Sequence, residues 1–555
     1  MDQRVDSNRS LIGRSPFGGA GTAAVVAVPA LFLAYFFLYP VATITYRGLT
    51  TDGRFNPAVL GDILSDPTLQ GVAAFTLWQA VISTVLTVLA GLPAAWIFAR
   101  FDFPGKSLMR AATLVPFVLP TLVVGTAFLA LIGPRGVTGD DLTGTLAIIV
   151  IAHVFYNYAI VVRGVGTYWE RIDPSLEEAA RSLGASRTQA FRTITLPLLR
   201  PAIASTSALV FLFSFTSFGV ILLLGDIHHS TIEVEIWRQT TAYLRLDIAS
   251  TLAVMQLIGV GLILMLYGRY QMRTTVQFSH RASLPPRPAN RHERTAVWSI
   301  LGISGALVGL PLGILIARSM MQPQGGIGFA NYLNLFRLTA KSGAFVHPVE
   351  AIVNSLSFAV IAAVIGVTIG VLASAGLSYA RPHVARTFDL LVMLPLGTSA
   401  VTIGFGFLVA LDWPVDLRTS LILIPIAHAL VAIPFVVRTI SPSMGSVQHH
   451  LREAAATLGA TPAKAWWTID LRLVSRSILV GGAFAFAISM GEFGATSFIT
   501  RPDTPTIPIA IFRLLGRPGS TPFGAAVALS VLLMFITGIA VLIIDSLRRP
   551  TAGEL

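Results

Sequence analysis

The chain has 555 residues, of which 54% are hydrophobic and only 12% are charged, and its mean hydropathy is +0.73. A soluble protein of this length would carry about 25% charged residues, so the composition excludes an ordinary soluble enzyme and predicts an all-α polytopic membrane protein. The absence of cysteine excludes disulfides and cysteine-ligated metal, and a net charge of +12 fits basic loops beside a membrane better than nucleic-acid binding.

The N-terminal 20 residues are polar and lack the order of a cleaved signal peptide, so we expect the first apolar run to be retained. Apolar runs of about 20 residues predict twelve membrane-spanning helices. They cover 21–45, 71–99, 111–133, 145–162, 201–225, 247–268, 296–317, 349–379, 388–411, 420–437, 477–498 and 523–545. An even number of spans places both termini on one side of the membrane.

The side of the membrane follows from the basic residues. Loops and tails on the side of the N-terminus hold 27 of the 39 lysines and arginines. Because cytoplasmic loops carry the excess of Lys and Arg, both termini are predicted to be cytoplasmic. The residues 269–294 hold six arginines and one acid around a Pro-rich centre, and they predict a linker between two six-span halves. The predicted organisation is a tail at 1–20, a first domain at 21–268, a basic linker at 269–295, a second domain at 296–546 and a tail at 547–555.

Between the second and third spans, Gly105-Lys106-Ser107 invites a nucleotide-binding interpretation. A phosphate-binding P-loop needs another glycine five residues before the first of these, and position 100 is arginine. We therefore predict no ATPase motif in this chain, and no cofactor bound by it.

The cytoplasmic loop after the fourth span begins "EEAARSLGASRTQAF". Glu177 and Glu178 suit the first turn of a short helix, where the helix dipole favours negative charge. Ala179 and Ala180 let another surface approach the backbone closely, and Gly184 suits the end of this helix. A second short helix is predicted over about 186–193.

A copy of this loop lies 275 residues later. Glu453-Ala454-Ala455 and Gly459 repeat the first loop, and the same offset relates other residues over about 85 positions. The further pairs include His153 and His428, Ser214 and Ser489, Phe218-Gly219 and Phe493-Gly494, and Arg238 and Arg513. A duplication in the same orientation predicts two parallel halves related by a pseudo-two-fold axis, with a pathway between them.

The motif Glu-Ala-Ala, three residues, Gly, nine residues, Ile-x-Leu-Pro resembles the cytoplasmic loop of permease subunits of binding-protein-dependent ABC importers. The first loop matches it through Pro197, whereas the second has Arg472 at that position, which leaves its local geometry open. The resemblance implies the type I ABC importer permease fold and two coupling helices, each docked on one copy of an ATPase subunit that binds ATP and Mg²⁺. It also implies an extracytoplasmic binding protein and a location in the bacterial inner membrane.

Two fused halves are similar to ferric-iron and thiamine permeases, which implies thiamine or ferric iron as the solute. The segment "GEFGATSFI" (491–499) also resembles sulfate and molybdate permeases, so an oxyanion is the alternative. An ion-coupled secondary transporter of the major-facilitator type shares the twelve spans. The loop between its second and third spans has an Asp-Arg-Gly-rich pattern that this chain lacks.

Polar side chains within predicted spans are candidates for the pathway. These are Glu492, its repeat counterpart Ser217, the equivalent pair His153 and His428, and Asn157. Hydrogen bonding between helices is the competing interpretation, and we favour it over metal ligation for the two histidines. No metal site is predicted.

The outer loop 225–246 carries two histidines and two glutamates, His228, His229, Glu233 and Glu235. We expect a solvated loop there rather than a metal site. Arg238 and Arg513 are candidate contacts with the binding protein.

Overall fold

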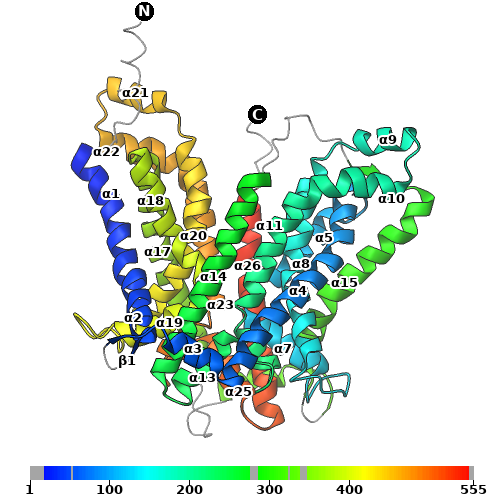
Figure 1. Cartoon of the computed structure of the whole chain (residues 1–555), viewed down its shortest axis with the longest axis horizontal. Coiled ribbons are helices and arrows are strands. Elements are labelled where there is room, and N and C mark those ends of the chain that lie inside the picture. The colour runs from blue at the N-terminus through cyan, green and yellow to red at the C-terminus, as the bar shows by residue number, and fades with distance from the viewer. Residues whose placement is uncertain (1–17, 52–53, 275–285, 323–324, 338–346, 549–555) are drawn as a thin grey trace, which may run out of the picture. The chain divides into compact units, whose positions relative to one another are not determined.

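The computed structural model describes residues 18–51, 54–274, 286–322, 325–337 and 347–548 (Figure 1). Ten helices in these ranges are long and apolar enough to cross a membrane. They are Ala23–Gly48, Pro67–Arg100, Leu146–Glu170, Arg187–Phe215, Leu246–Tyr270, Arg291–Met320, Pro348–Tyr379, Leu423–Gly445, Pro462–Gly491 and Ser520–Ile544. Two bent helix pairs stand at the places of the third and ninth predicted spans, Lys106–Val118 with Thr121–Ile132 and Pro382–Gly397 with Ala400–Ala410.

The bends are sharp, at 101° and 99°, and prolines explain them. Pro120 separates the first pair in extended backbone, with ψ 139°, and it has no N–H to continue a helix. In the second pair Pro395 lies in a 3₁₀ turn, and Ser399 then caps the next helix by accepting a hydrogen bond from Thr402 N at 3.0 Å. The hydropathy pattern predicts each apolar run but does not predict the bend within it.

The chain divides into two compact units. The first span of each sequence half packs in the unit that is formed mainly by the other half. Unit 1 comprises Met1–Arg47, Leu335–Arg513 and Phe535–Leu555, and unit 2 comprises Gly48–Asn334 and Leu514–Met534. The helix α1 (Gly18–Leu33) packs in unit 1 against α17 (Pro348–Tyr379), whereas α15 (Arg291–Met320) packs in unit 2 against α7 (Thr121–Ile132) and α4 (Pro67–Arg100). The units therefore differ from the predicted domains at 21–268 and 296–546.

Unit 1 is built mainly on three long helices, α17, α20 (Leu423–Gly445) and α23 (Leu471–Gly491), whose buried faces contribute to two apolar clusters that also include residues of α1. Its remaining elements follow in chain order. They are η1 Ala34–Leu38, α2 Tyr39–Gly48, α18 Pro382–Met393, η4 Leu394–Gly397, α19 Ala400–Ala410, α20 Leu423–Gly445, α21 His449–Thr457, α22 Pro462–Ala465, η5 Trp466–Asp470, α23 Leu471–Gly491 and α24 Thr496–Ile499. Four helices contribute to both units. They are α2, whose last residue Gly48 belongs to unit 2, and α16 Ala330–Arg337, α25 Ile507–Leu515 and α26 Ser520–Arg548.

Unit 2 is built on α4, α8 and α11 in the same way. Its further elements are β1 Thr50–Thr51, β2 Arg54–Phe55, α3 Val59–Ser65, β3 Phe101–Asp102, α5 Lys106–Ala112, α6 Val115–Val118, α8 Leu146–Glu170, α9 Ser175–Ser182, α10 Arg187–Ala190, η2 Phe191–Thr195, α11 Leu196–Phe215, α12 Gly219–Leu224, α13 Ile232–Thr241, α14 Leu246–Thr274 and β4 Arg287–Pro288. The strands β1 and β2 pair antiparallel, and β3 pairs in parallel with β4 from the linker. Part of the predicted linker, 275–285, lies outside the described residues.

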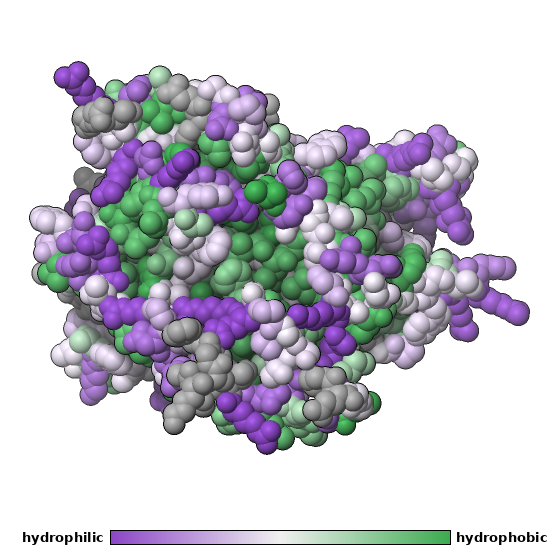
Figure 2. Space-filling model, turned by 90° about the horizontal axis from the view of Figure 1, so that it is seen from below, coloured by the Kyte–Doolittle hydropathy of each residue, from purple (hydrophilic) through white to green (hydrophobic). Residues whose placement is uncertain are grey.

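Large apolar side chains also lie on the surface, as Figure 2 shows by its extended green areas. On α4, for example, Leu77, Trp78 and Leu89 are more than half exposed. Exposed apolar area on long helices is what a lipid environment requires, so this is a multi-pass membrane protein.

Candidate functional site: two repeated loops and the broken helices that follow them

The first loop, residues 171–195, folds as two short helices joined by a left-handed glycine. α9 ends at Ser182, and Gly184, two residues later, has a φ of +94°. Gly184 N donates to Arg181 O at 3.0 Å and Ala185 N donates to Ala180 O at 3.1 Å. These two bonds form a Schellman motif, which satisfies carbonyls at the end of the helix. The helix, the turn and the glycine stand where the sequence predicts them.

The second loop, residues 446–470, has the same construction. Gly459 has φ +81°, its N–H donates to Ala456 O at 3.0 Å, and Ala460 N donates to Ala455 O at 2.9 Å. The following elements also agree at an offset of 275, since α10 and η2 correspond to α22 and η5 residue by residue. Arg472, where the first loop has Pro197, therefore leaves the boundaries of these elements unchanged.

Each loop presents the predicted small-residue helix outward. Glu178, Ala179, Glu453 and Ala454 are exposed, and Ala180 and Ala455 are half-buried. The side chains that stand out most were not predicted. Leu183 is 91% exposed and Leu458 is 88% exposed, and they occupy equivalent positions just before the two left-handed glycines. The signal in the sequence is an apolar residue repeated at the 275 offset in an otherwise polar loop.

The other face of each loop is anchored on the spans. In the first loop, the rings of Phe191 and Trp169 stack at 6.1 Å, which ties η2 to α8. In the second, Trp466 and Met444 occupy the equivalent positions and share one buried apolar cluster. The turns η2 and η5 therefore connect the exposed helix of each loop, α9 or α21, to a membrane helix.

A polar cluster adds a second anchor in unit 1. Asp470, at the end of η5, is fully buried and accepts hydrogen bonds from Arg452 Nε at 2.9 and 3.1 Å and from Tyr379 Oη at 3.2 Å. Burial acts to lower the pKa of Arg452, but the hydrogen bonds and charge of Asp470 outweigh it and raise that pKa. Arg452 therefore stays charged.

Within unit 2, the predicted pathway residues gather in one buried polar cluster. His153 Nδ1 lies 3.1 Å from Ser83 Oγ, and His153 Nε2 lies 2.8 Å from Ser217 Oγ. Asn157 Nδ2 donates to Ser214 Oγ at 3.4 Å. These contacts connect α4, α8 and the end of α11.

Unit 1 holds the equivalent cluster around His428. Its Nδ1 lies 2.7 Å from Ser489 Oγ, and its Nε2 lies 2.8 Å from Thr496 Oγ1 and 3.3 Å from Glu492 Oε2. Glu492 Oε1 also accepts a hydrogen bond from Ala495 N at 2.8 Å, and Oε2 accepts from Thr496 N at 3.1 Å and Thr496 Oγ1 at 2.6 Å. Glu492 is 6% exposed, and its carboxylate thus satisfies the backbone N–H groups of Ala495 and Thr496 at the start of α24.

Both clusters sit where a predicted span is interrupted. The predicted spans 201–225 and 477–498 break at 216–218, after α11, and at 492–495, after α23. Gly219 is the first residue after the first break, and Gly494, at the equivalent position, lies within the second. A Cβ at these glycines would meet Thr121 Oγ1 at 2.4 Å and Ala400 Cβ at 3.1 Å. The repeated Phe-Gly pair thus lets the short helix after each break pack closely on a neighbour.

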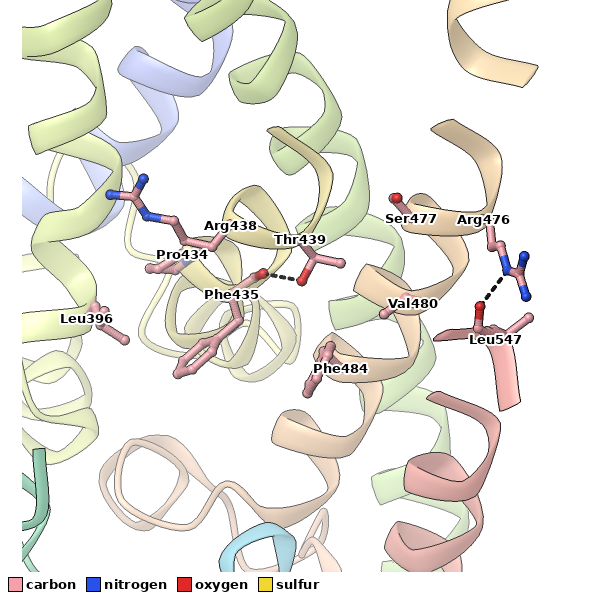
Figure 3. Close-up of a pocket in the computed structure, with 10 residues that line it drawn as sticks. All are labelled: Leu396, Pro434, Phe435, Arg438, Thr439, Arg476, Ser477, Val480, Phe484 and Leu547. Atoms are coloured by element: carbon pink, nitrogen blue, oxygen red, sulfur yellow. Dashed lines mark hydrogen bonds between the residues drawn. The ribbon is translucent and has the colours of Figure 1, made fainter. Parts of the chain in front are cut away.

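A groove of about 690 Å³ opens in unit 1 between α20 and α23. It is lined by Leu396, Pro434, Phe435, Arg438, Thr439, Arg476, Ser477, Val480, Phe484 and Leu547. In Figure 3 the guanidinium groups of Arg438 and Arg476 lie on opposite sides of the groove, with Phe435 and Phe484 between them. Arg438 Nη2 donates to Asp389 Oδ2 at 3.2 Å and Arg476 Nε donates to Leu547 O at 2.5 Å.

The region 225–246 is not the solvated loop that the sequence suggests. Residues 232–241 form the helix α13, in which Glu233 is 0% and Glu235 is 5% exposed. Gln256 Nε2 donates to Glu233 Oε1 at 2.8 Å, and Gln239 Nε2 donates to Glu235 Oε1 at 2.7 Å. Acidic and apolar residues alternate at the start of α13, and this pattern does not predict a helix. Side-chain amides that donate to the two carboxylates allow both glutamates to be buried.

The two arginines predicted to meet a binding protein are both engaged within the chain. Arg238 Nη1 donates to Glu235 Oε2 at 2.9 Å, and Arg513 donates to Pro502 O at 3.2 Å and Arg501 O at 3.4 Å. A search of the described residues finds no group of three or more His, Asp or Glu side chains that could hold a metal ion.

The sequence matches one family of membrane transport proteins in both halves. The family profile of the binding-protein-dependent transport system inner membrane component matches residues 87–274 and 366–550. A thiamine transport system permease protein of Brucella abortus (strain 2308) is 27% identical over 496 residues, which cover 86% of this chain and 88% of that protein. A sulfate transport system permease protein of Salmonella typhimurium is 34% identical over 209 residues, covering 36% of this chain and 74% of that protein.

Among solved structures, a bacterial ABC transporter involved in the import of the acidic polysaccharide alginate aligns with a TM-score of 0.39 and 18% identity, covering 45% of this chain and 94% of that chain. Each of the two family matches contains one complete repeat loop and leaves out the exchanged spans α1 and α15. The chain therefore belongs to the family of binding-protein-dependent transport system inner membrane components, as a fused, two-domain permease subunit of an ABC importer.

Proposed function

We propose that this permease forms the translocation pathway for a small solute delivered by an extracytoplasmic binding protein, and that two copies of a partner ATPase drive it. The observation that carries this proposal is the loop of helix, left-handed glycine and helix, which occurs once in each half with equivalent exposed residues. Two equivalent outward-facing loops fit two copies of one partner.

The loops lie in the cytoplasm in this proposal, as do both termini, because the bacterial inner membrane retains Lys- and Arg-rich segments on that side. ATP and Mg²⁺ then bind to the partner subunits. In this chain Gly105 forms a left-handed turn, and Lys106 Nζ donates to Phe101 O at 2.7 Å, so this lysine caps a chain carbonyl.

The docking face of each loop combines the small residues with the exposed leucine. On the first loop these are Glu178, Ala179, Ala180, Leu183 and Gly184, and on the second they are Glu453, Ala454, Ala455, Leu458 and Gly459. The alanines allow close approach of the partner. Burial of one leucine is worth about 1.5–3 kcal/mol, which makes the leucines the largest apolar contribution to docking.

Inside the membrane, we assign the pathway candidates His153, Ser217, Asn157, His428 and Glu492 to the breaks after α11 and α23. A break held by hydrogen-bonded side chains is a place where a helix can change direction when the pathway alternates between states. Arg238 and Arg513 stay the proposed contacts with the binding protein, each presented from a short helix before the last span of its half.

The proposed solute is thiamine, with ferric iron next, because the fused relative from Brucella abortus is named a thiamine permease. An oxyanion is the alternative solute, and the groove between α20 and α23 favours it. Arg438 and Arg476 place two cationic groups around it, with the hydroxyls of Thr439 and Ser477 in its lining. Relatives named as sulfate and molybdenum permeases match 36% and 42% of this chain.

Co-purification tests the docking proposal. Tagged chain should retain the ATPase, and Leu183→Ala with Leu458→Ala should lower the affinity for it by about tenfold or more, given the apolar burial lost. Leu310→Ala, on an exposed face of the span α15, is the matched control and should leave the affinity unchanged. Retention of the ATPase at wild-type affinity by the double variant would contradict the assignment of these loops.

Uptake into proteoliposomes by the complete transporter, with its binding protein, then separates the solutes. ATP-dependent uptake of thiamine supports the leading proposal, and uptake of sulfate or molybdate supports the oxyanion alternative.

A further inference from the structure

The two docking loops are fastened to their spans by different chemistry. At an offset of 275, Arg452 corresponds to Glu177 and Asp470 corresponds to Thr195. Each pair joins the docking helix to the π-helical turn that leads into the next span. In unit 2 the pair makes one hydrogen bond, from Thr195 Oγ1 to Glu177 Oε2 at 3.2 Å.

In unit 1 the same two positions form an ion pair with a third partner. Arg452 bonds Asp470 through both Nε and Nη2, and its Nη2 donates to Tyr379 Oη at 2.8 Å. The guanidinium also lies over the ring of Tyr379, 5.1 Å from its centroid. Tyr379 is the last residue of α17, so this cluster joins the docking helix α21, the turn η5 and a long span.

The helix that corresponds to α17 in unit 2 is α4, and its last residue, Arg100, makes a different contact. Arg100 Nη1 donates to Ile172 O at 3.0 Å, at the start of the loop and before the docking helix. The charge of Arg100 also attracts the carboxylates of Glu177 and Glu178 on the docking helix α9, but the side-chain hydrogen bond between this helix and its turn is the one from Thr195 to Glu177.

The environment makes the second fastening harder to open. Asp470 is 0% exposed, and the side chain of Arg452 is 18% exposed. Separating them would leave a charged group buried without its partner, which is strongly unfavourable. Breaking the bond between Thr195 and Glu177 costs less, because it leaves only a neutral hydroxyl buried, at 1% exposure, while the half-buried carboxylate stays accessible to water.

We propose that Arg452, Asp470 and Tyr379 lock the second docking loop rigidly to its spans, while the first loop can tilt, so that the two ATPase subunits are coupled unequally to the pathway. The inference rests on the proposed docking function. These three are positioning residues: they fix the angle at which α21 meets the ATPase, and they touch neither solute nor nucleotide.

The chain itself offers a matched pair of variants. Arg452→Glu with Asp470→Thr gives the second loop the residues of the first. Glu177→Gln with Thr195→Val removes the weaker bond from the first loop. Arg452→Gln with Asp470→Asn is a milder third variant, because a neutral pair keeps hydrogen-bonding groups and avoids an unpaired buried charge.

Spin labels measure the rigidity directly, because the chain has no cysteine. Ser182→Cys and Thr457→Cys place labels at equivalent exposed positions at the ends of α9 and α21. In the full-length chain we expect the label at 457 to be less mobile than the label at 182. The Arg452→Glu, Asp470→Thr variant should raise the mobility at 457 to that at 182, and equal mobilities in the otherwise unaltered chain would overturn the proposal.

Coupling is measured in the assembled transporter as the stimulation of ATP hydrolysis by the solute-loaded binding protein. We expect the Arg452→Glu, Asp470→Thr variant to lose stimulation by about three- to tenfold, which lies within the range of effects of coupling-network mutations. It should still retain the ATPase, and the Glu177→Gln, Thr195→Val variant should change stimulation less than twofold. Equal effects of the two, or full stimulation in both the swap and the Arg452→Gln, Asp470→Asn variant, would overturn the inference.

Measurements on the wild-type complex distinguish a failure of this inference from a failure of the proposed docking function. If unaltered chain retains no ATPase, the docking function itself fails. If it retains the ATPase and shows stimulated hydrolysis, only the comparison of variants decides the role of the lock.

Discussion

Glu492 and Ser217 occupy equivalent positions and stabilise the same kind of break with different numbers of bonds. Ser217 holds its break through His153 and through its own carbonyl, which accepts a bond from Thr231 Oγ1 at 2.9 Å. Glu492 offers two acceptor oxygens, and both are used by N–H and O–H groups of the next helix. A carboxylate therefore replaces contacts that the first half builds from several neutral groups.

We predict that Glu492→Gln lowers the free energy of unfolding by about 1–3 kcal/mol, because the amide NH₂ would face an N–H donor that the second oxygen now accepts from. Ser217→Ala, the equivalent change in the other half, should cost about 1 kcal/mol, the value of one hydrogen bond. Thermal unfolding of the detergent-solubilised chain checks both, with the wild type as reference. A Glu492→Gln variant that melts with the wild type would show that the carboxylate is not the cap of α24.

At the scale of elements, the periodicity of apolar residues predicts that helices exist and where they lie, but not where they bend. The twelve predicted runs coincide with ten straight candidates and two bent pairs. Pro120 lies inside a predicted span, and a proline inside an apolar run is compatible with either a kink or a turn. Glu233 and Glu235 misled in the opposite direction. The amide partner of Glu233 is Gln256, 23 residues away on α14, whereas Glu235 pairs with Gln239 one turn later on α13, a helix that was not predicted from the sequence.

The docking loops were predictable because their information is local. A small-residue helix and its closing glycine lie within about ten residues, and Schellman geometry needs no distant partner. Leu183 and Leu458 were missed because exposure of one apolar side chain depends on what the rest of the fold leaves uncovered. Their repetition at one offset was the available clue.

We predict that Gly184→Ala and Gly459→Ala each strain their loop by about 1–2 kcal/mol, the cost of a left-handed conformation for a residue with a Cβ. Open space surrounds both glycines, so the effect comes from φ alone. The affinity of the tagged chain for its ATPase should fall accordingly in the double variant. Gly445→Ala is the control: this residue ends α20 with no positive φ and an equally open surrounding, and its affinity should match the wild type.

For the whole molecule, membership in the importer family replaces the secondary-transporter alternative that twelve spans alone had left open. The exchange of first spans, in contrast, could not be predicted from the sequence. Hydropathy places α1 and α15 as spans but is silent about the unit in which each packs. Gly376 in α17 makes the contact with α1 visible, since a Cβ there would meet Val26 Cγ2 and a ring carbon of Phe388, each at 3.1 Å.

The exchange predicts that neither half of the chain is complete alone. A fragment 281–555 lacks α1 and leaves the surface of α17 around Gly376 uncovered, so we expect it to accumulate poorly or to melt well below the intact protein. Co-expression with fragment 1–280 should restore its stability and yield a complex that purifies through a tag on either piece, because 1–280 supplies α1 to unit 1 and receives α15 into unit 2. Co-expression with fragment 49–280, which keeps every other span of the first half, is the control and should fail to rescue. If 281–555 is equally stable with 49–280 and with 1–280, packing by α1 contributes nothing to unit 1. A rescue that requires residues 1–48 would show that the first span stabilises the half of the permease that it does not belong to in sequence.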